Sequence, residues 1–211
     1  LADLGVSSMQ IDNPERGFTY KSDGPLDLRL NPEAGISAAD RLRQLDYEEL
    51  VGMMQENADE PYAEAIARQI IRAEKHRPIR TTRELYAVIE AALEKVRLPR
   101  DAAGKVPDRR DIIRKSSARV FQALRIDVNH EYEVLYEFME KLPGALKPGG
   151  RVAILTFHSG EDKLVKKALK AGYKEGIYSE YARDVVRPSA QECAQNGRAR
   201  STKMRWAVKA E

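Results

Sequence analysis

The first residues whose types and spacing suit chemistry lie close to the start of the chain. The segment from Ala2 to Val6 is apolar but carries Asp3 and Gly5, and the pair Ser7 and Ser8 follows it. A parallel strand has this composition where it enters a site loop, because α/β proteins bind ligands at the carboxyl ends of their strands. The segment is too short for a whole strand. We therefore expect it to be the end of a strand that begins upstream of the chain.

Common catalytic and cofactor-binding motifs are missing from the sequence. The one Gly-Gly pair, Gly149-Gly150, precedes an apolar strand, whereas a phosphate- or dinucleotide-binding loop follows a strand and opens a helix. No Gly-x-Ser-x-Gly elbow occurs. Cys193 is the single cysteine and the three histidines are far apart in sequence. We therefore expect no disulfide, no structural metal and a reducing compartment.

The middle of the chain has the apolar spacing of helices, between two loops. Residues 11–36 are rich in turn pairs such as Asn13-Pro14 and Asp23-Gly24, and so long an ordered loop is usually functional. Residues 97–111 combine proline, glycine and charges, which predicts a flexible basic loop. Periodicity predicts helices from a Ser37 cap to Leu45, Tyr47 to Asn57, Pro61 to His76, a Thr82 cap to Val96, Ser116 to Val128 and Glu131 to Leu142.

The last third of the chain predicts strands that alternate with helices. Val152 to Phe157 is a continuous apolar run, typical of a strand buried on both faces of a parallel sheet, and Ser159 can cap the helix after it. A strand near Ala182 to Val186, a short helix after Pro188 and a strand from Thr202 to Lys209 follow. This order predicts an α/β, Rossmann-like domain from residues 1–32 and 142–211, with a helical insertion at residues 33–141.

Composition excludes several classes of protein. The 211 residues are 42% hydrophobic and 33% charged, which suits a globular domain or a core with a small insert. The longest apolar run is far shorter than the roughly 18 to 20 residues of a membrane span, so we expect no membrane association. Leu1 is not followed by the pattern of a secretion signal.

The net charge of +3 is unevenly distributed. Lys95 to Arg125 holds ten Lys and Arg against three Asp, and Arg183 to Glu211 holds seven against three acids. Two basic segments on an acidic body favour a polyanionic partner such as nucleic acid, because phosphates reward clustered cations. The alternative is a solvated arginine-rich loop and a charged sheet edge.

Many of these segments together resemble one protein family. The matching stretches are DLGVSSMQID (3–12), RGF (16–18), DGPLDLR (23–29), RVFQALRI (119–126) with Val128 and Asn129, LKPGGRV (146–152), FHS (157–159) with Glu161 and Asp162, RPS (187–189) and NGRARS (196–201) with Arg205. In this order and spacing they resemble the signature of the MraW/RsmH family, which are S-adenosylmethionine-dependent ribosomal RNA cytosine N4-methyltransferases. The resemblance extends over all 211 residues.

The resemblance implies the C-terminal part of an S-adenosylmethionine-dependent methyltransferase fold, with an all-helical domain inserted after the fourth strand. Family members begin further upstream, with a strand, a GGGHS-type loop and an acidic residue that hold much of the cofactor. The sequence also departs from the family at two places. The stretch KSSAR (115–119) stands where the family usually reads HPATR, and Gly160 replaces a usual Leu.

The resemblance assigns two contacts with S-adenosylmethionine, Asp3 and Gln10, both on the adenosine side. A carboxylate and an amide at the carboxyl end of a strand can bond adenine and ribose edges. The alternative is that Asp3 caps a turn and Gln10 is a surface loop residue.

Methylation of a cytosine amine requires a flipped base whose N4 points at the methyl sulfonium. Hydrogen-bond acceptors must polarise this amine, because its lone pair is delocalised into the ring, and the candidates are Ser7, Ser8 and nearby backbone carbonyls. Phe18 or Tyr20 can stack on the base. His158, after the next predicted strand, is a candidate proton acceptor or orienting group; alternatively, it is a strand-end histidine bonded to a backbone carbonyl.

The expected partner is small-subunit ribosomal RNA, methylated near the decoding centre, or the 30S-type subunit, in the cytoplasm or an organellar matrix. A homodimer or pairing with an upstream segment would complete the sheet. A second hypothesis is a catalytically inactive relative that acts as an RNA-binding or ribosome-assembly factor. The expected RNA contacts are Phe18, Tyr20, Arg29, Arg119, Arg125, Asn129, Arg198, Arg200, Lys203 and Arg205.

Overall fold

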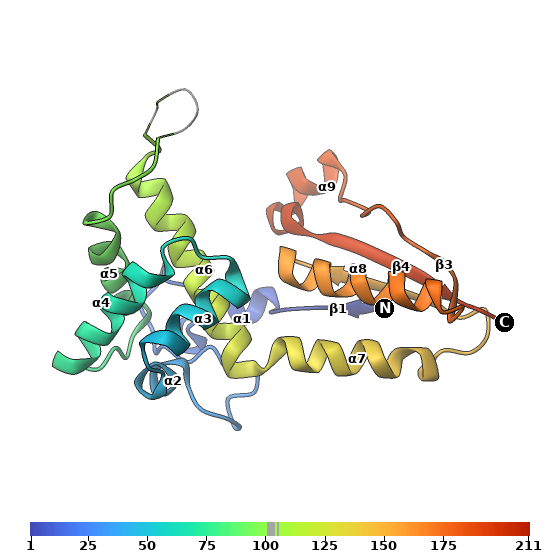
Figure 1. Cartoon of the computed structure of the whole chain (residues 1–211), viewed down its shortest axis with the longest axis horizontal. Helices are drawn as coiled ribbons and strands as arrows, with labels where there is room; N and C mark the ends of the chain where they lie inside the picture. The colour runs from blue at the N-terminus through green and yellow to red at the C-terminus, as the bar shows by residue number, and fades with distance from the viewer. Residues whose placement is uncertain (101–103, 105) are drawn as a thin grey trace. The chain divides into compact units, whose positions relative to one another are not determined.

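The computed structural model describes residues 1–100, 104 and 106–211, and it contains two compact units. The helical unit comprises Val6–Glu131, and the sheet unit comprises Leu1–Gly5 together with Tyr132–Glu211 (Figure 1). Part of the predicted loop 97–111, namely residues 101–103 and 105, lies outside the described residues. The two units are described separately below.

The helical unit is built on one apolar core. Helix α3 packs against α4 and α6, and α4 packs against α5. Leu50, Ile66, Ile70, Leu85 and Leu124 are all fully buried at the centre of this core. The elements are α1 (Ser8–Asp12), the 3₁₀ turn η1 (Pro14–Arg16), α2 (Ala38–Gln44), α3 (Tyr47–Ala58), α4 (Ala63–His76), α5 (Thr82–Glu94) and α6 (Arg109–Asn129).

Local capping chemistry shifts two of the predicted helix starts. Thr81, not Thr82, caps α5, because its side chain accepts from the N–H of Glu84. Thr82 is instead buried and donates its hydroxyl to the carbonyl of Ser22. Helix α6 begins at Arg109 after an Asp108 cap, earlier than the predicted start near Ser116. The charged first turns of α6 concealed its helical pattern.

Helix α1 is absent from the sequence prediction. Ser7 accepts from the N–H of Gln10 at 3.2 Å, and Gln10 Oε1 accepts from the N–H of Ser7 at 2.9 Å. This reciprocal capping box satisfies two backbone donors that the first turn leaves unpaired. The Ser-x-x-Gln spacing is the sequence signal that would have predicted the helix.

The sheet unit has four strands in the order β1-β2-β4-β3. Strand β1 is parallel to β2, with Ala2 opposite Ile154 and Asp3 opposite Leu155, while β4 is antiparallel to β2 and β3. The elements are β1 (Ala2–Asp3), α7 (Glu131–Ala145), β2 (Arg151–Thr156), α8 (Ser159–Lys174), β3 (Tyr178–Tyr181), α9 (Ala190–Gln195), the 3₁₀ turn η2 (Gly197–Ser201) and β4 (Lys203–Lys209).

Two strand predictions need correction. Strand β2 is buried on one face only: Val152 and Ile154 are packed in the core with α7 and α8, whereas Ala153 on the other face is half-buried. Ala153 and Trp206 are among the residues that line a hollow of about 500 Å³. Strand β3 precedes the predicted strand near Ala182–Val186, of which Val186 forms only an isolated bridge to Met204. The sequence of β3, Tyr-Ser-Glu-Tyr, has no apolar alternation, and its pairing with β4 is irregular between Tyr178 and Glu180, so periodicity does not reveal this strand.

The compact units divide the chain at other places than the predicted domain boundaries. Residues 6–32 belong to the helical unit, and residues 132–141 belong to the sheet unit, where Leu135 and Met139 of α7 pack with β2. The two packing units do not test the predicted domain boundaries, which therefore stay a prediction. No helix within the described part of the chain is long and apolar enough to cross a membrane.

The departure at Gly160 has a structural reason within the sheet unit. Gly160 lies in the first turn of α8, and a Cβ atom at this position would overlap the hydroxyl of Tyr132, with the Tyr132 Cζ only 2.9 Å away. Tyr132 therefore occupies the space that a larger side chain at position 160 would need.

We predict that Gly160→Leu lowers the free energy of unfolding by about 1 to 3 kcal/mol, because overpacking strains the contact with Tyr132. Combining it with Tyr132→Ala should recover at least half of the loss, since this removes the overlapping ring. Urea denaturation of the two single variants and the double variant measures the coupling. Strictly additive effects would contradict the proposed contact.

Candidate functional site

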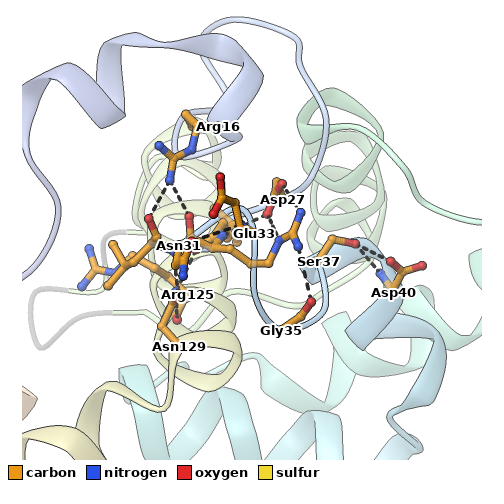
Figure 2. Close-up of polar contacts among 12 residues, drawn as sticks. Arg16, Asp27, Asn31, Glu33, Gly35, Ser37, Asp40, Arg125 and Asn129 are labelled. Carbon is orange, nitrogen blue, oxygen red and sulfur yellow. Dashed lines mark hydrogen bonds and ion pairs between the residues drawn. The ribbon is translucent and has the colours of Figure 1, made fainter.

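The loop from Asn13 to Ser37, which contains two of the family-like motifs, is held in place by Asn129 of α6 (Figure 2). Asn129 Nδ2 donates to the carbonyl of Leu28 at 2.8 Å, and its Oδ1 accepts from the N–H of Leu30 at 2.7 Å. The same Nδ2 also donates to the carbonyl of Arg125 in its own helix. The Asn129 amide thus forms hydrogen bonds with the loop backbone of the kind that a neighbouring strand forms in a sheet.

Arg16 supports the same turn of the loop from the other direction (Figure 2). Its Nη2 donates to the carbonyls of Arg29 at 2.7 Å and Leu30 at 2.9 Å. The next residue, Gly17, has φ +72°, and a Cβ there would overlap the carbonyl oxygen of Pro25. Only glycine therefore allows the two parts of the loop to approach so closely.

Two buried leucines anchor the loop to the helical core. Leu26 and Leu28 are each only 1% exposed, and both belong to the core of the helical unit. Leu28 has φ +63°, a left-handed conformation that is unfavourable for a leucine. Burial of the Leu28 side chain offsets the cost of this backbone conformation, and so do the Asn129 hydrogen bonds to the carbonyl of Leu28 and the N–H of Leu30.

Asp27 and Arg29 form a two-pronged ion pair within the loop (Figure 2). Arg29 Nε lies 2.6 Å from Oδ1 of Asp27, and Nη2 lies 2.9 Å from Oδ2. Burial raises the pKa of Asp27, but the hydrogen bonds and charge of Arg29 outweigh this and hold it below its usual value. Arg29 also donates to the carbonyl of Gly35, so it fixes the loop conformation.

The residues expected to bind the cofactor and the cytosine base are divided between the two units. Asp3 ends β1 in the sheet unit and is exposed. Ser7, Ser8 and Gln10 belong to the helical unit, where Ser7 and Gln10 form the capping box of α1. Ser8 is exposed at the first position of that helix. Gln10 uses Oε1 for the cap, and its Nε2 has two hydrogens for donation.

The two candidate stacking residues differ in their surroundings. Tyr20 is stacked on Tyr86, with ring centroids 5.2 Å apart, and is tilted against Phe121 at 5.3 Å. Its hydroxyl donates to the carbonyl of Arg114, and burial, with a smaller effect of Tyr86, raises its pKa. Phe18 is half-buried, and the guanidinium of Arg16 lies 5.7 Å from its ring centroid.

His158 caps helix α8, a role predicted for Ser159. Its Nδ1 accepts a long hydrogen bond of 3.5 Å from the N–H of Glu161, and its Nε2 lies 3.1 Å from Oε1 of Glu161. The other oxygen of Glu161 accepts from the N–H of Phe157. An accepting Nδ1 places the proton of a neutral imidazole on Nε2, towards the carboxylate. The geometry therefore agrees with an orienting role, and proton acceptance stays a prediction.

Arg119 lies beside a buried carboxylate. Glu60 is 2% exposed; its Oε1 accepts from the hydroxyl of Ser116 at 2.8 Å and from the N–H of Tyr62 at 3.0 Å. Its Oε2 lies 3.7 Å from Nη1 of Arg119, whose side chain is 40% exposed. Ser116 stands at the usual proline of the HPATR motif, so this departure supplies a hydrogen bond that proline cannot make. Arg119 combines a buried counter-ion with access to solvent.

Like Arg29 and Arg119, two further arginines expected to contact RNA, Arg125 and Arg205, are paired with carboxylates. Arg125 binds Glu131 through Nε and Nη2, at 2.8 and 3.0 Å. Arg205 is 4% exposed and binds Asp162 of α8 through Nε and Nη2, at 2.7 and 3.3 Å. Burial raises the pKa of Asp162, but the hydrogen bonds and charge of Arg205 hold it below its usual value.

The rest of the predicted C-terminal cations are differently placed. Lys203 Nζ lies 3.7 Å from Oδ2 of Asp162, and its side chain is 18% exposed. Arg198 and Arg200 are exposed on η2, where Asn196 caps the turn by accepting from the N–H of Arg198. The predicted RNA contacts of all these residues stay predictions, but geometry separates the exposed pair from the buried Arg205.

Sequence reasoning missed the carboxylates that hold these arginines. Asp27 lies shortly before its partner Arg29, and Glu131 lies shortly after its partner Arg125, so sequence spacing could have indicated both pairs. Glu60 and Asp162 lie 59 and 43 residues from their partners, and spacing does not reveal such pairs.

A mixed sheet with one parallel pair and an interposed helical unit are consistent with the Rossmann-like fold of S-adenosylmethionine-dependent methyltransferases. Comparison with known proteins makes the assignment specific. Residues 1–210 match the model of the MraW methylase family. The chain belongs to this family.

Several relatives are similar over the whole chain. Ribosomal RNA small subunit methyltransferase H 1 of Agathobacter rectalis is 71% identical over 212 residues, covering all of this chain and 58% of the relative. The protein of the same name from Lachnoclostridium phytofermentans is 60% identical over 211 residues, covering all of the chain and 56% of the relative. Ribosomal RNA small subunit methyltransferase H of Acidobacterium capsulatum is 39% identical over 209 residues, covering 99% and 65%. The chain thus spans little more than half the length of the first two.

We predict that Asp162→Asn destabilises the protein by about 3 kcal/mol at pH 7, because it leaves the buried Arg205 without its counter-ion. A carboxyl whose folded pKa is lowered contributes stability above its unfolded pKa of about 4 and loses it as the pH falls through the folded pKa. The difference between the two proteins should therefore shrink below about pH 4. Urea denaturation at pH 7, 5 and 3.5 measures it.

The matched control is Asp184→Asn, an exposed carboxylate in the same unit. It should change the free energy of unfolding by less than about 0.5 kcal/mol at each pH. An Asp162→Asn effect that is equal at pH 7 and 3.5 would show that charge pairing is not its cause.

Proposed function

We propose that the protein containing this chain transfers a methyl group from S-adenosylmethionine to N4 of a cytidine in small-subunit ribosomal RNA. The observation that carries the proposal is the family match over residues 1–210, together with relatives whose names specify small-subunit ribosomal RNA. The site lies after a parallel strand, where Rossmann-like proteins bind their ligands. An RNA substrate of this kind suits a location in the cytoplasm or an organellar matrix.

The chain offers two side chains that fit the adenosine part of the cofactor. Asp3 is an exposed carboxylate that can accept from ribose hydroxyls, and the Nε2 group of Gln10 can donate to an adenine nitrogen. The capping box fixes the direction of the Gln10 amide before any ligand binds. S-adenosylmethionine supplies an electrophilic methyl group on its sulfonium.

The base would be placed by the loop and the start of α1. Phe18 is the better stacking candidate, because Tyr20 is held by two rings and a hydroxyl hydrogen bond. Ser8 is the better acceptor for the cytosine amine, because one lone pair of the Ser7 oxygen is used by the helix cap. An acceptor on the amine hydrogen makes N4 more nucleophilic, and the nitrogen then loses a proton to solvent or to a nearby acceptor.

His158 would act by positioning. Its bond to the first turn of α8 fixes the junction between β2 and that helix at the carboxyl edge of the sheet. Protonating Nδ1 would break this cap. We therefore favour an orienting role over proton transfer.

Small ribosomal subunits are the proposed partner, with Arg119, Arg198 and Arg200 as the most accessible of the predicted phosphate contacts. The half-buried face of the sheet around Ala153 and Trp206 suits pairing with a further segment of the protein, or with a second copy.

We predict different kinetic effects for the two parts of this site. Asp3→Ala should raise the Michaelis constant for S-adenosylmethionine at least tenfold, because its partner is the adenosine. Phe18→Ala and Ser8→Ala should mainly lower turnover at saturating cofactor, since base placement matters most in the transition state. Loss of stacking costs on the order of 1 to 3 kcal/mol.

The assay measures transfer of labelled methyl groups to small ribosomal subunits, followed by nucleoside analysis, with Ser22→Ala on the exposed part of the loop as the control. Absence of N4-methylcytidine with the unaltered protein would reject the proposed activity and favour an assembly factor without catalysis. Normal turnover of Phe18→Ala and Ser8→Ala would place the base elsewhere.

We also predict that Arg200→Gln and Arg205→Gln separate RNA contact from structure. Arg200→Gln should lower the slope of log affinity against log salt by up to about 0.7 to 0.9 and leave the unfolding curve unchanged. Arg205→Gln should reduce stability, because it removes the two-pronged partner of Asp162 and leaves this carboxylate with Lys203 at 3.7 Å. Filter binding between 50 and 300 mM salt and thermal melting provide the two readouts, and the reverse result would contradict this division.

A further inference from the structure

A basic surface of the helical unit lies outside the two basic segments identified from the sequence. Arg68, Arg72 and Lys75 follow one another at intervals of four and three residues, so they share one face of α4. The opposite face, with Ile66 and Ile70, is buried in the core. The turn after α4 and the first turn of α5 continue the charge. The α4–α5 basic patch comprises Arg68, Arg72, Lys75, Arg77, Arg80 and Arg83, all of them exposed.

Three acids close to the turn, Asp23, Glu74 and Glu84, accept hydrogen bonds from its backbone, while Glu64 is exposed in the first turn of α4. Glu84 Oε2 accepts from the N–H groups of Arg80 and Thr81, and its Oε1 pairs with Arg77 at 2.8 Å. Glu74 Oε1 accepts from the N–H of Ile79 at 2.8 Å. Asp23 Oδ1 accepts from the N–H of Arg83 at 3.3 Å. These carboxylates shape the turn, and Glu84 also forms an ion pair with Arg77.

Helix electrostatics do not account for the patch. Cations near the C-terminus of α4, such as Lys75, interact favourably with the helix dipole. Arg83, however, lies in the first turn of α5, where the dipole disfavours a cation, and Arg68 lies in the middle of α4. Arg68 lies 6.0 Å from the ring centroid of Tyr47 and Arg77 pairs with Glu84, so two members of the patch have partners within the protein, and helix electrostatics do not explain the other four together.

The patch is bonded directly to the loop that carries the site. Leu26 donates its N–H to the carbonyl of Arg80 at 2.9 Å, and Thr82 donates its N–H to the carbonyl of Gly24 at 3.0 Å. Pro25 and Thr81 form an isolated antiparallel bridge. A hollow of about 280 Å³ between the two segments has Arg80 and Arg43 among its lining residues. A polyanion bound to the patch would therefore lie against the Asn13–Ser37 loop.

We propose that the α4–α5 basic patch is a docking surface for the sugar-phosphate backbone of the substrate RNA. The proposal rests on the proposed function and adds a contact surface to it. Arginine guanidinium groups bind phosphate oxygens in pairs, which suits RNA. A membrane surface fits less well: among the described residues, the large exposed hydrophobic side chains all lie outside residues 63–94, so this surface has none to insert into lipid.

The test neutralises the patch in the protein that contains this chain. The variant Arg72→Gln, Lys75→Gln, Arg80→Gln, Arg83→Gln retains Arg77 and its bond to Glu84. Binding to purified small-subunit ribosomal RNA should weaken at least tenfold at about 0.15 M salt. The slope of log affinity against log salt should fall by about 0.7 to 0.9 for each phosphate contact that is lost.

The charge-matched control replaces four exposed lysines of α8, in Lys166→Gln, Lys167→Gln, Lys170→Gln, Lys174→Gln. It should retain affinity within about threefold. A third variant combines Arg72→Lys, Arg80→Lys and Arg83→Lys. It keeps the charge, so its slope of log affinity against log salt should equal that of the unaltered protein. Thermal melting of all variants checks that they are folded.

The inference would be overturned by unchanged RNA binding of the patch variant or by an equal loss of binding in the α8 control. It would also be overturned if the patch variant lost binding to anionic phosphatidylglycerol vesicles but kept its binding to RNA, or if the unaltered protein did not bind the RNA. Methyl transfer is measured separately. Binding through the patch without any methyl transfer would reject the proposed function while leaving the docking surface supported.

Discussion

The conformation of the Asn13–Ser37 loop depends on side-chain hydrogen bonds, from Asn129 outside the loop and from Arg16 within it. The chain there forms neither a long helix nor a sheet ladder, so its polar backbone groups need other partners. Asn129 supplies a donor to Leu28 and an acceptor to Leu30, and Arg16 supplies donors to two further carbonyls. Without them, Leu28 would have little reason to remain at a positive φ angle, and the residues on either side would lose their fixed directions.

The arginines of this protein have two different tasks that composition alone does not separate. Arg29, Arg125 and Arg205 each face a carboxylate through two nitrogen atoms. Such paired groups fix loops and helices, and an RNA phosphate would have to compete with a well-placed carboxylate for them. Arg200 of η2 and the arginines of α4 and the α4–α5 turn have exposed side chains. Local pairing, rather than net charge, therefore indicates where a polyanion can bind.

Much of the fold could be predicted from the sequence, because helical periodicity reports burial directly. Helices α2 to α5 and α7 lie close to their predicted ranges, and the strands β2 and β4 were recognised from apolar runs and alternation. The errors occur where local hydrogen bonding decides the outcome. His158 takes the cap predicted for Ser159, and Ser7 and Gln10 create a helix in a segment with too few apolar residues to show a period.

The candidate site was less predictable than the fold, for a physical reason. Candidate residues such as Asp3 and His158 can be proposed from their order along the chain after predicted strands, and their roles stay predictions. Hydrogen-bond partners cannot be proposed in this way, because pairs such as Glu60 with Arg119 and Asp162 with Arg205 are created by tertiary packing. The same packing gives Tyr20 two aromatic ring partners, although Tyr20 and Phe18 are both partly buried against the core of the helical unit.

The joining of the loop to the α4–α5 turn links two properties that an RNA-modifying site needs. A flipped base must be held to within a fraction of an ångström, which requires a rigid support, while the RNA backbone is held by many weaker ionic contacts over a larger area. Here Leu26 and Gly24 of the loop bond to the backbone of the turn, and Leu26 and Leu28 are inserted in the core beneath it. Phosphate contacts on the turn would thus act on the same rigid body that orients the base-binding residues. Binding energy from the RNA backbone could then contribute to base placement, since little of it would be lost in movement of an intervening flexible segment.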